Sequence, residues 1–178
     1  MQKDTRLKLR RLITYGLPLA AAVLLDRISK ILVLKYLKNG ELTLIKGVLD
    51  LRYVENKGSA FGMFSSLPII PMLLSAVFCI GLTVFVLKAK EIRPAYLILF
   101  GFVAGGGIGN LIDKLAFGYV VDFIDFRMFS FWKWVFNIAD SFVTVCVIVF
   151  FIMYAAEDIR LGREKRNKEY KEDKDARG

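Results

Sequence analysis

Three aspartates lie in two strongly apolar stretches and could do chemistry together. Asp122 and Asp125 fall within GYVVDFIDF (118–126), and Asp140 lies near the start of FNIADSFVTVCVIVFFIMY (136–154). Apolar surroundings penalise a charged carboxylate. Two aspartates that share a site cannot both ionise easily, and a pair that holds one proton can activate water and protonate a leaving group.

The absence of histidine narrows the possible chemistry. The chain has 178 residues and no histidine, which excludes Ser-His and Cys-His hydrolases, HExxH metalloproteases and histidine proton relays. Ser29 and Lys30 are neighbours on an expected helix, so their side chains point apart and do not suit a Ser-Lys dyad. Carboxylate chemistry remains, and it needs no metal and no cofactor.

The residues alone do not decide which acid of 118–126 meets Asp140. In an extended segment, positions 122 and 125 point to opposite faces, so only one of them can face Asp140. Asp122 and Asp125 are therefore both candidates at this point.

Four apolar stretches must position these acids. The chain is 56% hydrophobic, which is high for a soluble domain. A helix needs roughly 20 mostly apolar residues to cross a membrane, and the stretches that fit are 12–37, 67–87, 94–115 and 135–156. We therefore expect a mainly α-helical membrane protein, a four-transmembrane-helix bundle that forms a single integral membrane domain over 1–178.

The basic residues predict how the bundle is oriented. Lysines and arginines gather in the head (3–11), in the connection 88–93 and in the tail (157–178). Because such residues concentrate on the cytoplasmic side, both termini are expected in the cytoplasm. The formal net charge of +9 then anchors the chain beside anionic membrane lipid, and we expect no nucleic-acid partner.

Two outer segments and the tail are distinct from the spans. The segment 38–66 contains the β-prone stretches LTLI and VLDLRYV, which predict a small extracytoplasmic β-sheet. The segment 116–134 ends on Trp132 and Trp134, which fit an interfacial aromatic belt. The charged tail 157–178 is expected to be a frayed helix or a disordered extension.

Polar groups from three expected helices fall at one depth. With a rise of ~1.5 Å per residue, Asp26 lies roughly 21 Å above the cytoplasmic edge, and Asn110 and Asp140 both lie roughly 22 Å above it. Asp113 follows at roughly 27 Å. This layer lies in the outer third of the bilayer, where ionisable groups usually mark function.

Spacing within the helices adds two expectations. Asp26 and Lys30 are four residues apart on one helix face and can pair. A second pattern is a ladder of small residues, Gly101, Gly105 and Gly109, that lets another helix approach closely.

Five short motifs follow one another between Asp26 and Val145. They are DRISK (26–30), NKGSAFG (56–62), GNLIDK (109–114), VVDFIDF (120–126) and FNIAD (136–140). In this order they resemble the Asp-x-x-x-Lys, Asn-x-Gly-x-Ala-Phe-Gly and Gly-Asn-x-x-Asp-Arg motifs and the two catalytic boxes of the bacterial lipoprotein signal peptidases (signal peptidase II).

The resemblance implies an aspartic endopeptidase, active as a monomer in the bacterial cytoplasmic (inner) membrane with its site toward the outer face. Its substrate would be a diacylglyceryl-modified prolipoprotein, cut just before the lipidated cysteine. Asp122 and Asp140 would be the catalytic dyad, and Asp125 a structural or rim residue. The residues that would shape the site or bind substrate are Asp26, Lys30, Asn56, Gly106, Asn110, Asp113, Lys114 and Asn137. Lys114 departs from the family pattern, which has arginine there, and an ammonium cannot make the forked contacts of a guanidinium.

Other membrane protein classes fit the sequence less well. A small transporter would place its acids near the midplane and often shows internal repeats, whereas these acids lie off-centre and no repeat is visible. A presenilin-like protease would carry a Gly-x-Gly-Asp signature, which the sequence lacks. A non-catalytic scaffold gives no reason for a second aligned acid.

Overall fold

The computed structural model describes residues 2–58, 69–89, 91–128 and 134–175. The elements in chain order are α1 (Gln2–Tyr36), β1 (Glu41–Ile45), β2 (Leu49–Asn56), α2 (Ile69–Lys88), α3 (Pro94–Phe117), β3 (Val120–Phe126), β4 (Val135–Phe136) and α4 (Ile138–Asp175). Residues 59–62 of the NKGSAFG motif and Trp132 lie outside the described residues.

The described chain is mainly helical with a small antiparallel sheet, as the sequence predicts. Three of its helical stretches are long and apolar enough to cross a membrane, namely Ile69–Lys88, Pro94–Phe117 and Ile138–Tyr170. Helix α1, which carries Asp26, Arg27 and Lys30, is not among them. On α2 the large apolar side chains face outward, with Val77 67% exposed and Ile80 65% exposed.

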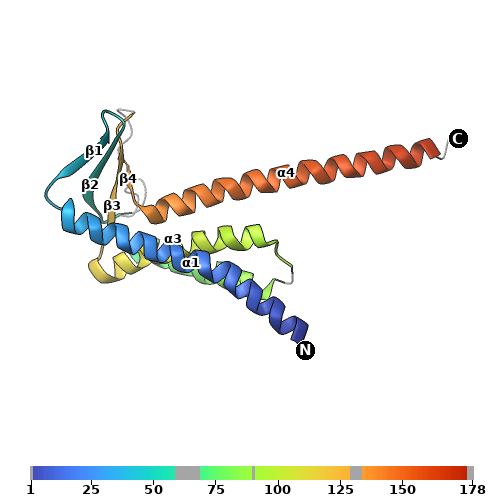
Figure 1. The fold of residues 1–178 in the computed structure, drawn as a ribbon, viewed down its shortest axis with the longest axis horizontal. Helices are drawn as coiled ribbons and strands as arrows, with labels where there is room; N and C mark the ends of the chain where they lie inside the picture. Colours follow the sequence, from blue (N-terminus) through green and yellow to red (C-terminus); the bar gives the residue numbers. More distant parts are fainter. Residues whose placement is uncertain (1, 59–68, 90, 129–133, 176–178) are drawn as a thin grey trace. The chain divides into compact units, whose positions relative to one another are not determined.

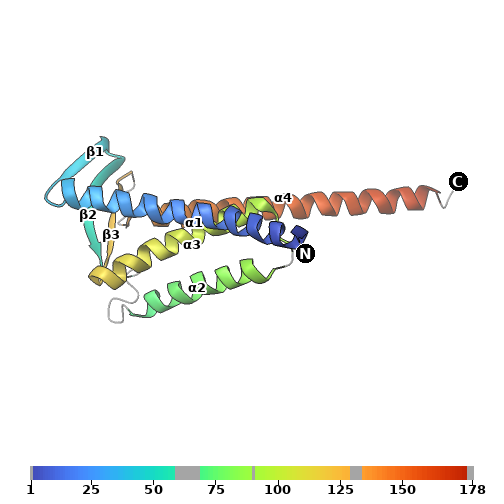
Figure 2. The same ribbon diagram turned by 60° about the horizontal axis from the view of Figure 1, so that its bottom comes forward.

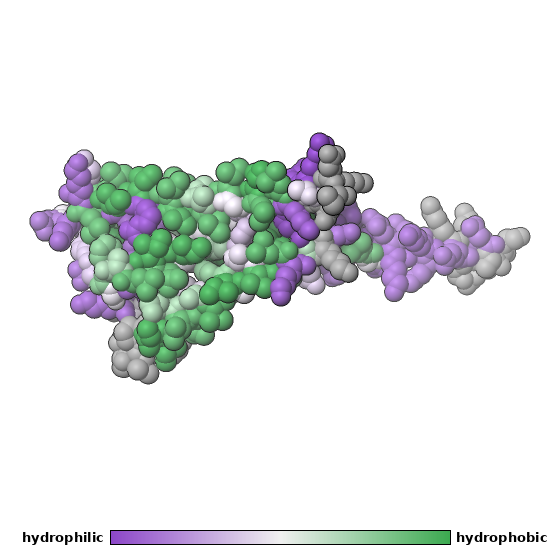
Figure 3. Space-filling model, turned by 90° about the horizontal axis from the view of Figure 1, so that it is seen from below, coloured by the Kyte–Doolittle hydropathy of each residue, from purple (hydrophilic) through white to green (hydrophobic). Residues whose placement is uncertain are grey.

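The chain divides into two compact units, Met1–Cys146 and Val147–Gly178. In the first unit, apolar side chains form a broad band on the face that Figure 3 shows. The described part of the second unit is the continuation of α4, and its residues from Asp158 to Tyr170 are exposed. The charged tail is thus helical through Asp175, beyond what its charge pattern predicts.

Helices α1 and α3 pack side by side through glycines (Figures 1 and 2). A Cβ placed on Gly105 would lie 2.5 Å from the carbonyl oxygen of Leu19, and one on Gly109 would lie 2.5 Å from Asp26 Oδ2. Gly101 approaches the Tyr15 carbonyl oxygen in the same way. The close helix approach predicted from the glycine ladder is therefore confirmed.

The sheet joins the two outer segments of the chain. Its strand order is β1-β2-β3-β4, and every neighbouring pair is antiparallel. Strands β1 and β2 come from the β-prone segment, whereas β3 carries Asp122 and Asp125. The participation of β3 was not predicted, because the pairing of β2 with β3, more than 60 residues apart, leaves no local pattern in the sequence. Strand β4 joins the sheet through β3.

One apolar core fixes the sheet to the end of α1. Val121 and Phe123 of β3 are buried together with Val33 of α1. Gly118 lies between α3 and β3 and terminates α3 with φ 79°, and its N–H donates a hydrogen bond to the Lys114 carbonyl oxygen at 3.0 Å. The left-handed backbone conformation at this position favours glycine, and it turns the chain directly into β3.

We predict that Gly105→Ala destabilises the protein. The new Cβ would meet the backbone of Leu19 and the Cβ of Ala22, so α1 and α3 must separate. Overpacking of this kind costs about 1–3 kcal/mol. The measurement is the apparent melting temperature in detergent. Gly81→Ala on α2 is the matched control, since a Cβ there meets nothing within 4 Å, and an equal fall for both variants would contradict the prediction.

Candidate active site

Asp122 of β3 and Asp140 of α4 line the same cavity, which has a volume of about 160 Å³. Asn56 of β2, and Asn110 and Lys114 of α3, line it with them. The structure therefore brings together residues that lie far apart in the sequence, from the sheet and from two helices. The two carboxylates share this cavity, as the chemistry of a proton-sharing pair requires.

Asn137 bridges the two carboxylates. Its side-chain amide donates to Asp122 Oδ1 at 2.7 Å and to Asn110 Oδ1 at 3.0 Å. Its backbone N–H donates to Asp140 Oδ2 at 3.3 Å, while its own Oδ1 accepts from the Asp140 N–H at 2.9 Å. Asn137 thus caps the N-terminus of α4, and its exchange with Asp140 has the form of a capping box. The asparagine at the start of α4 therefore helps to fix the positions of both carboxylates.

Asp140 is held from a second side by α3. The amide of Asn110 donates to Asp140 Oδ1 at 2.7 Å. Asp140 also lies in the first turn of α4, where the helix dipole favours a negative charge.

Asp122 is enclosed by amides and is 1% exposed. The Asn56 amide donates to its Oδ2 at 2.8 Å, opposite the bond from Asn137. The Asn56 side chain is itself fixed, because its Oδ1 accepts from the Gly58 N–H at 3.1 Å. Burial and the neighbouring charge of Asp140 raise the pKa of Asp122 to about 7, although the two amide bonds act in the opposite direction. Asp122 is therefore able to keep a proton near neutral pH.

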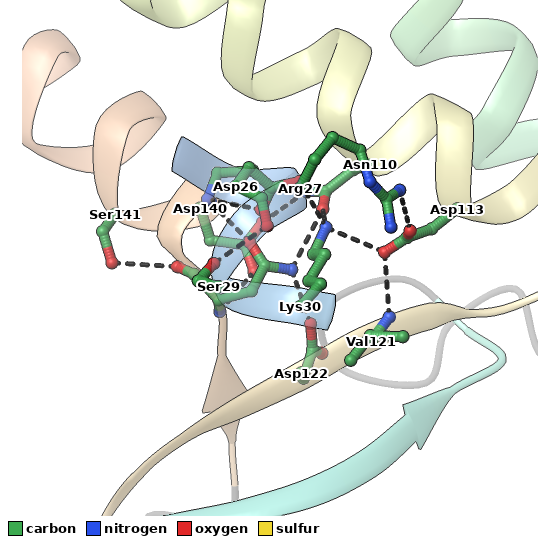
Figure 4. A network of polar contacts seen from close by, with 12 residues as sticks. Asp26, Arg27, Ser29, Lys30, Asn110, Asp113, Val121, Asp122, Asp140 and Ser141 are labelled. Atoms are coloured by element: carbon green, nitrogen blue, oxygen red, sulfur yellow. Dashed lines mark hydrogen bonds and ion pairs between the residues drawn. The ribbon is translucent and has the colours of Figure 1, made fainter. Parts of the chain in front are cut away.

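A buried lysine supports the whole arrangement. Lys30 is fully buried, and its ammonium lies 2.8 Å from Asp26 Oδ2, 2.8 Å from Asp113 Oδ2 and 2.9 Å from Asn110 Oδ1. Figure 4 shows Lys30 pointing from α1 toward Asn110 and Asp113 on α3. The buried ammonium therefore donates a hydrogen bond to Asn110 and forms ion pairs with both carboxylates. The Asp26–Lys30 pair predicted from the i, i+4 spacing is confirmed.

Asp113 links this cluster to the strand that carries Asp122. Its Oδ2 accepts the backbone N–H of Val121 at 3.1 Å, and Arg27 forms an ion pair with its Oδ1. Val121 immediately precedes Asp122, so α3 fixes β3 at the point where the acid emerges.

Asp26 and Gly106 place the start of α4. Asp26 Oδ1 accepts the Ala139 N–H at 3.2 Å. A Cβ on Gly106 would lie 2.6 Å from the Ala139 carbonyl oxygen, so the close approach of α3 and α4 requires a glycine there. Both residues hold the turn that contains Asp140.

Asp125 belongs to a separate charge cluster. It is 5% exposed, and its Oδ2 accepts from Arg52 Nε at 2.6 Å and from Arg127 Nε at 3.0 Å. Burial alone would raise its pKa, but the bonds from both arginines hold the pKa below its usual value. Asp125 therefore stabilises the sheet through its arginine partners. It lies on the face of β3 opposite to Asp122, and the prediction that only one of these two acids can face Asp140 agrees with this arrangement.

Lys114 faces the cavity with a weaker contact. Its ammonium donates to the Gly58 carbonyl oxygen at 3.4 Å.

The structure brings all ten sequence-predicted site residues into one connected region of the first unit.

Some residues of the site were missed from the sequence. Arg27 lies within the DRISK motif. Its charge, added to that of Lys30, matches the two acids Asp26 and Asp113, and this match could have indicated that Arg27 pairs with one of them. Ser75 and Met72 of α2 also line the cavity, and nothing in their local sequence distinguishes them from other residues of an apolar span.

Apolar helices joined to a small sheet, with paired carboxylates at the junction, define a membrane enzyme, and comparison with known proteins agrees. The family model for signal peptidase (SPase) II matches residues 19–156. The lipoprotein signal peptidase of Caldanaerobacter subterraneus subsp. tengcongensis is 42% identical over 73% of this chain and 88% of its own length. That of Chlorobium luteolum is 38% identical over 71% of this chain and 83% of its own length.

Solved structures support the same conclusion. A bacterial membrane enzyme superposes with a TM-score of 0.71 at 27% identity, over 79% of this chain and 87% of its own. The chain belongs to the signal peptidase II family, proteases that remove signal peptides from prolipoproteins.

We predict that the stability of the wild-type protein falls between pH 5 and pH 8 because of Asp122. Its pKa of about 7 lies above the ordinary value of 3.8, so the native state binds this proton more tightly than the unfolded state does. The stabilisation is complete below about pH 4 and is lost as the pH rises through about 7. The loss between pH 5 and pH 8 is roughly 2–3 kcal/mol.

Melting temperatures of wild type and Asp122→Asn, measured at both pH values, test this expectation. The wild type should lose stability relative to the variant as the pH rises. Asp125→Asn is the control, since the lowered pKa of Asp125 puts its titration below this range. Parallel pH profiles for wild type and Asp122→Asn would refute the assignment.

We also predict that Lys30→Met is strongly destabilising. The substitution leaves the buried carboxylates of Asp26 and Asp113 without their shared ammonium. Breaking a buried ion pair costs about 3–5 kcal/mol. Lys35→Met is the control on the same helix, because Lys35 is exposed and only lies over the Tyr36 ring at 5.0 Å. The yield and melting temperature of both variants provide the test, and a Lys30→Met protein as stable as wild type would count against the buried cluster.

Proposed function

We propose that the chain is an aspartic endopeptidase that removes signal peptides from diacylglyceryl-modified prolipoproteins, cleaving just before the lipidated cysteine. Asp122 and Asp140 form the catalytic dyad. The observation that carries this proposal is the shared cavity, in which two carboxylates from different elements each accept a hydrogen bond from one asparagine. The family supplies the class of substrate.

The dyad works with a single shared proton. Asp122 holds it, because burial and the charge of Asp140 raise its pKa to about 7. Asp140 accepts a proton from a water molecule, whose oxygen bonds to the carbonyl carbon of the scissile peptide, while Asp122 donates its proton to the carbonyl oxygen. The tetrahedral intermediate then collapses. Asp140 passes the proton that it took from water to the leaving nitrogen as the C–N bond breaks. Asp122 takes a proton from a hydroxyl of the intermediate, so the pair again holds one proton.

The amides hold both carboxylates in place. Asn56 and Asn137 each donate to an oxygen of Asp122, whereas Asp140 accepts from Asn110 and from a backbone N–H. These bonds fix both carboxylates before substrate arrives, so little reorganisation is needed during the reaction. Asp26, Lys30 and Asp113 are positioning residues that hold these groups in place.

Four spans with both termini in the cytoplasm fit this activity. Helix α1 is the fourth span, since its charged residues Asp26 and Lys30 are buried against each other rather than exposed to lipid. The distribution of lysine and arginine favours a cytoplasmic head and tail. The dyad then lies toward the outer face of the cytoplasmic (inner) membrane, where an acylated cysteine meets water. The chain acts as a monomer without a cofactor.

Lys114 takes the place of the family's arginine at the cavity. It keeps the positive charge beside the two acids, but it makes a single contact with the Gly58 carbonyl oxygen where a guanidinium could make two. We infer that the charge, rather than the forked geometry, is what this position contributes.

A cleavage assay tests the proposed dyad. The purified protein is reconstituted with a diacylglyceryl-modified prolipoprotein, and the mass shift is followed on a gel. We expect Asp122→Asn and Asp140→Asn each to reduce the rate at least about a hundredfold, because each removes one partner of general acid–base catalysis.

Asp125→Asn is the matched control, since Asp125 lies on the same strand with arginine partners outside the cavity. It should retain cleavage when folded. Full cleavage by Asp122→Asn or Asp140→Asn would exclude the aspartic mechanism, and no cleavage by folded wild type would refute the proposed activity.

A further inference from the structure

Helix α2 contributes a wall of the cavity that does not belong to the dyad or its support. Pro71, Met72 and Ser75 line the cavity from this helix, spaced so that they share one face. Of these three residues, Ser75 alone carries a polar side chain. It faces a cavity that also contains Asp122 and Asp140.

The Ser75 hydroxyl points toward α3 and the cavity. A Cβ built on Gly107 of α3 would lie 3.8 Å from Ser75 Oγ and 2.5 Å from Cys79 Sγ, so α2 and α3 approach closely just beside Ser75. Asn110 and Leu111 lie three and four residues after Gly107 on α3, and both line the cavity. The hydroxyl and these cavity residues thus occupy the same interface.

Ser75 differs from the other hydroxyl residue of α2. Thr83 donates to the Cys79 carbonyl oxygen at 2.8 Å and also pairs with the Tyr15 hydroxyl at 2.8 Å. Within the part of the chain that the structure describes, the Ser75 hydroxyl has no such bond. A hydroxyl that is left without a partner in an apolar span is costly, so its bonding capacity is available to a group that enters the cavity.

The chemistry of the substrate provides that group. An extended peptide brought to the dyad carries backbone N–H and C=O groups beside the scissile bond, and these groups lose water when they enter the cavity. A serine hydroxyl can donate to a carbonyl and accept from an N–H. The dyad and its asparagines come from β2, β3, α3 and the start of α4, so α2 is, among the described elements that line the cavity, a further side from which the peptide can be bound.

We propose that Ser75 is a substrate-binding residue, whose hydroxyl hydrogen-bonds the peptide backbone of the prolipoprotein beside the scissile bond. The inference rests on the proposed function, since it requires a peptide at the dyad. It adds a residue on α2 to a site otherwise built from the sheet, α1, α3 and α4.

The test compares steady-state cleavage by wild type, Ser75→Ala, Ser75→Thr and Ser75→Val. Loss of a neutral hydrogen bond corresponds to a roughly three- to tenfold lower kcat/KM, which is expected for Ala and for Val. Because the bond forms on substrate binding, the effect should appear mainly as a higher KM. Thr retains the hydroxyl at nearly the shape of Val, so Ser75→Thr should stay within about twofold of wild type.

Thr83→Val is the control for removing a hydroxyl from the same helix. It should lower the melting temperature, since Thr83 bonds to the protein itself, and leave KM unchanged. Equal kcat/KM for wild type and Ser75→Ala, or equal losses for the Thr and Val variants, would overturn the role of Ser75 while leaving the dyad intact. Absence of cleavage by wild type would overturn the proposed function and this inference with it.

Discussion

The buried ammonium of Lys30 is the constraint on which the site depends. A charge removed from water must find oxygens, or the fold that buries it is not stable. Lys30 finds them on two helices, as carboxylates of Asp26 and Asp113 and as the side-chain carbonyl of Asn110. Each of these oxygens belongs to a residue that makes a further bond. Asp113 binds β3, and Asn110 binds Asp140. One charge thereby fixes the relative positions of α1, α3, the strand of Asp122 and the start of α4.

The same network makes the two catalytic candidates unequal. Asp122 is enclosed on β3 by side-chain amides and has a pKa raised to about 7 by burial and by Asp140. Asp140 caps its own helix with Asn137 and accepts a backbone N–H. Two chemically identical side chains are therefore held by different partners from different elements in one cavity, an arrangement in which a pair can share a proton. The glycines of α3 permit this, because a side chain at Gly106 would displace the turn that carries Asp140.

Short-range patterns predicted much of this arrangement from the sequence. The i, i+4 spacing of Asp26 and Lys30 and the glycine ladder of α3 both describe contacts that the structure contains. The choice between Asp122 and Asp125 could not come from such patterns. Strand alternation separates their faces, but which face meets α4 depends on the pairing of β3 with β2 and on the arginines Arg52 and Arg127, which lie in other parts of the sheet or beyond it. The motif resemblance supplied the choice, and the partners of each acid supply its physical basis.

The cavity has a polar side, formed by the hydrogen-bonded acids and amides, and an apolar side formed by α2. On α2 only Cys79 and Val86 are buried, and most of the large side chains face outward, so this helix presents an apolar surface up to the rim of the cavity. A lipid-modified peptide has the matching character, with a polar backbone to be held at the carboxylates and acyl chains to be kept in hydrocarbon. Under the proposed function, a substrate that stays in contact with lipid along α2 delivers its peptide to Asp122 and Asp140 without its acyl chains entering water. The free energy that would be lost by exposing those chains, about 0.8 kcal/mol for each CH₂ group, is a strong reason for the site to lie at the lipid boundary.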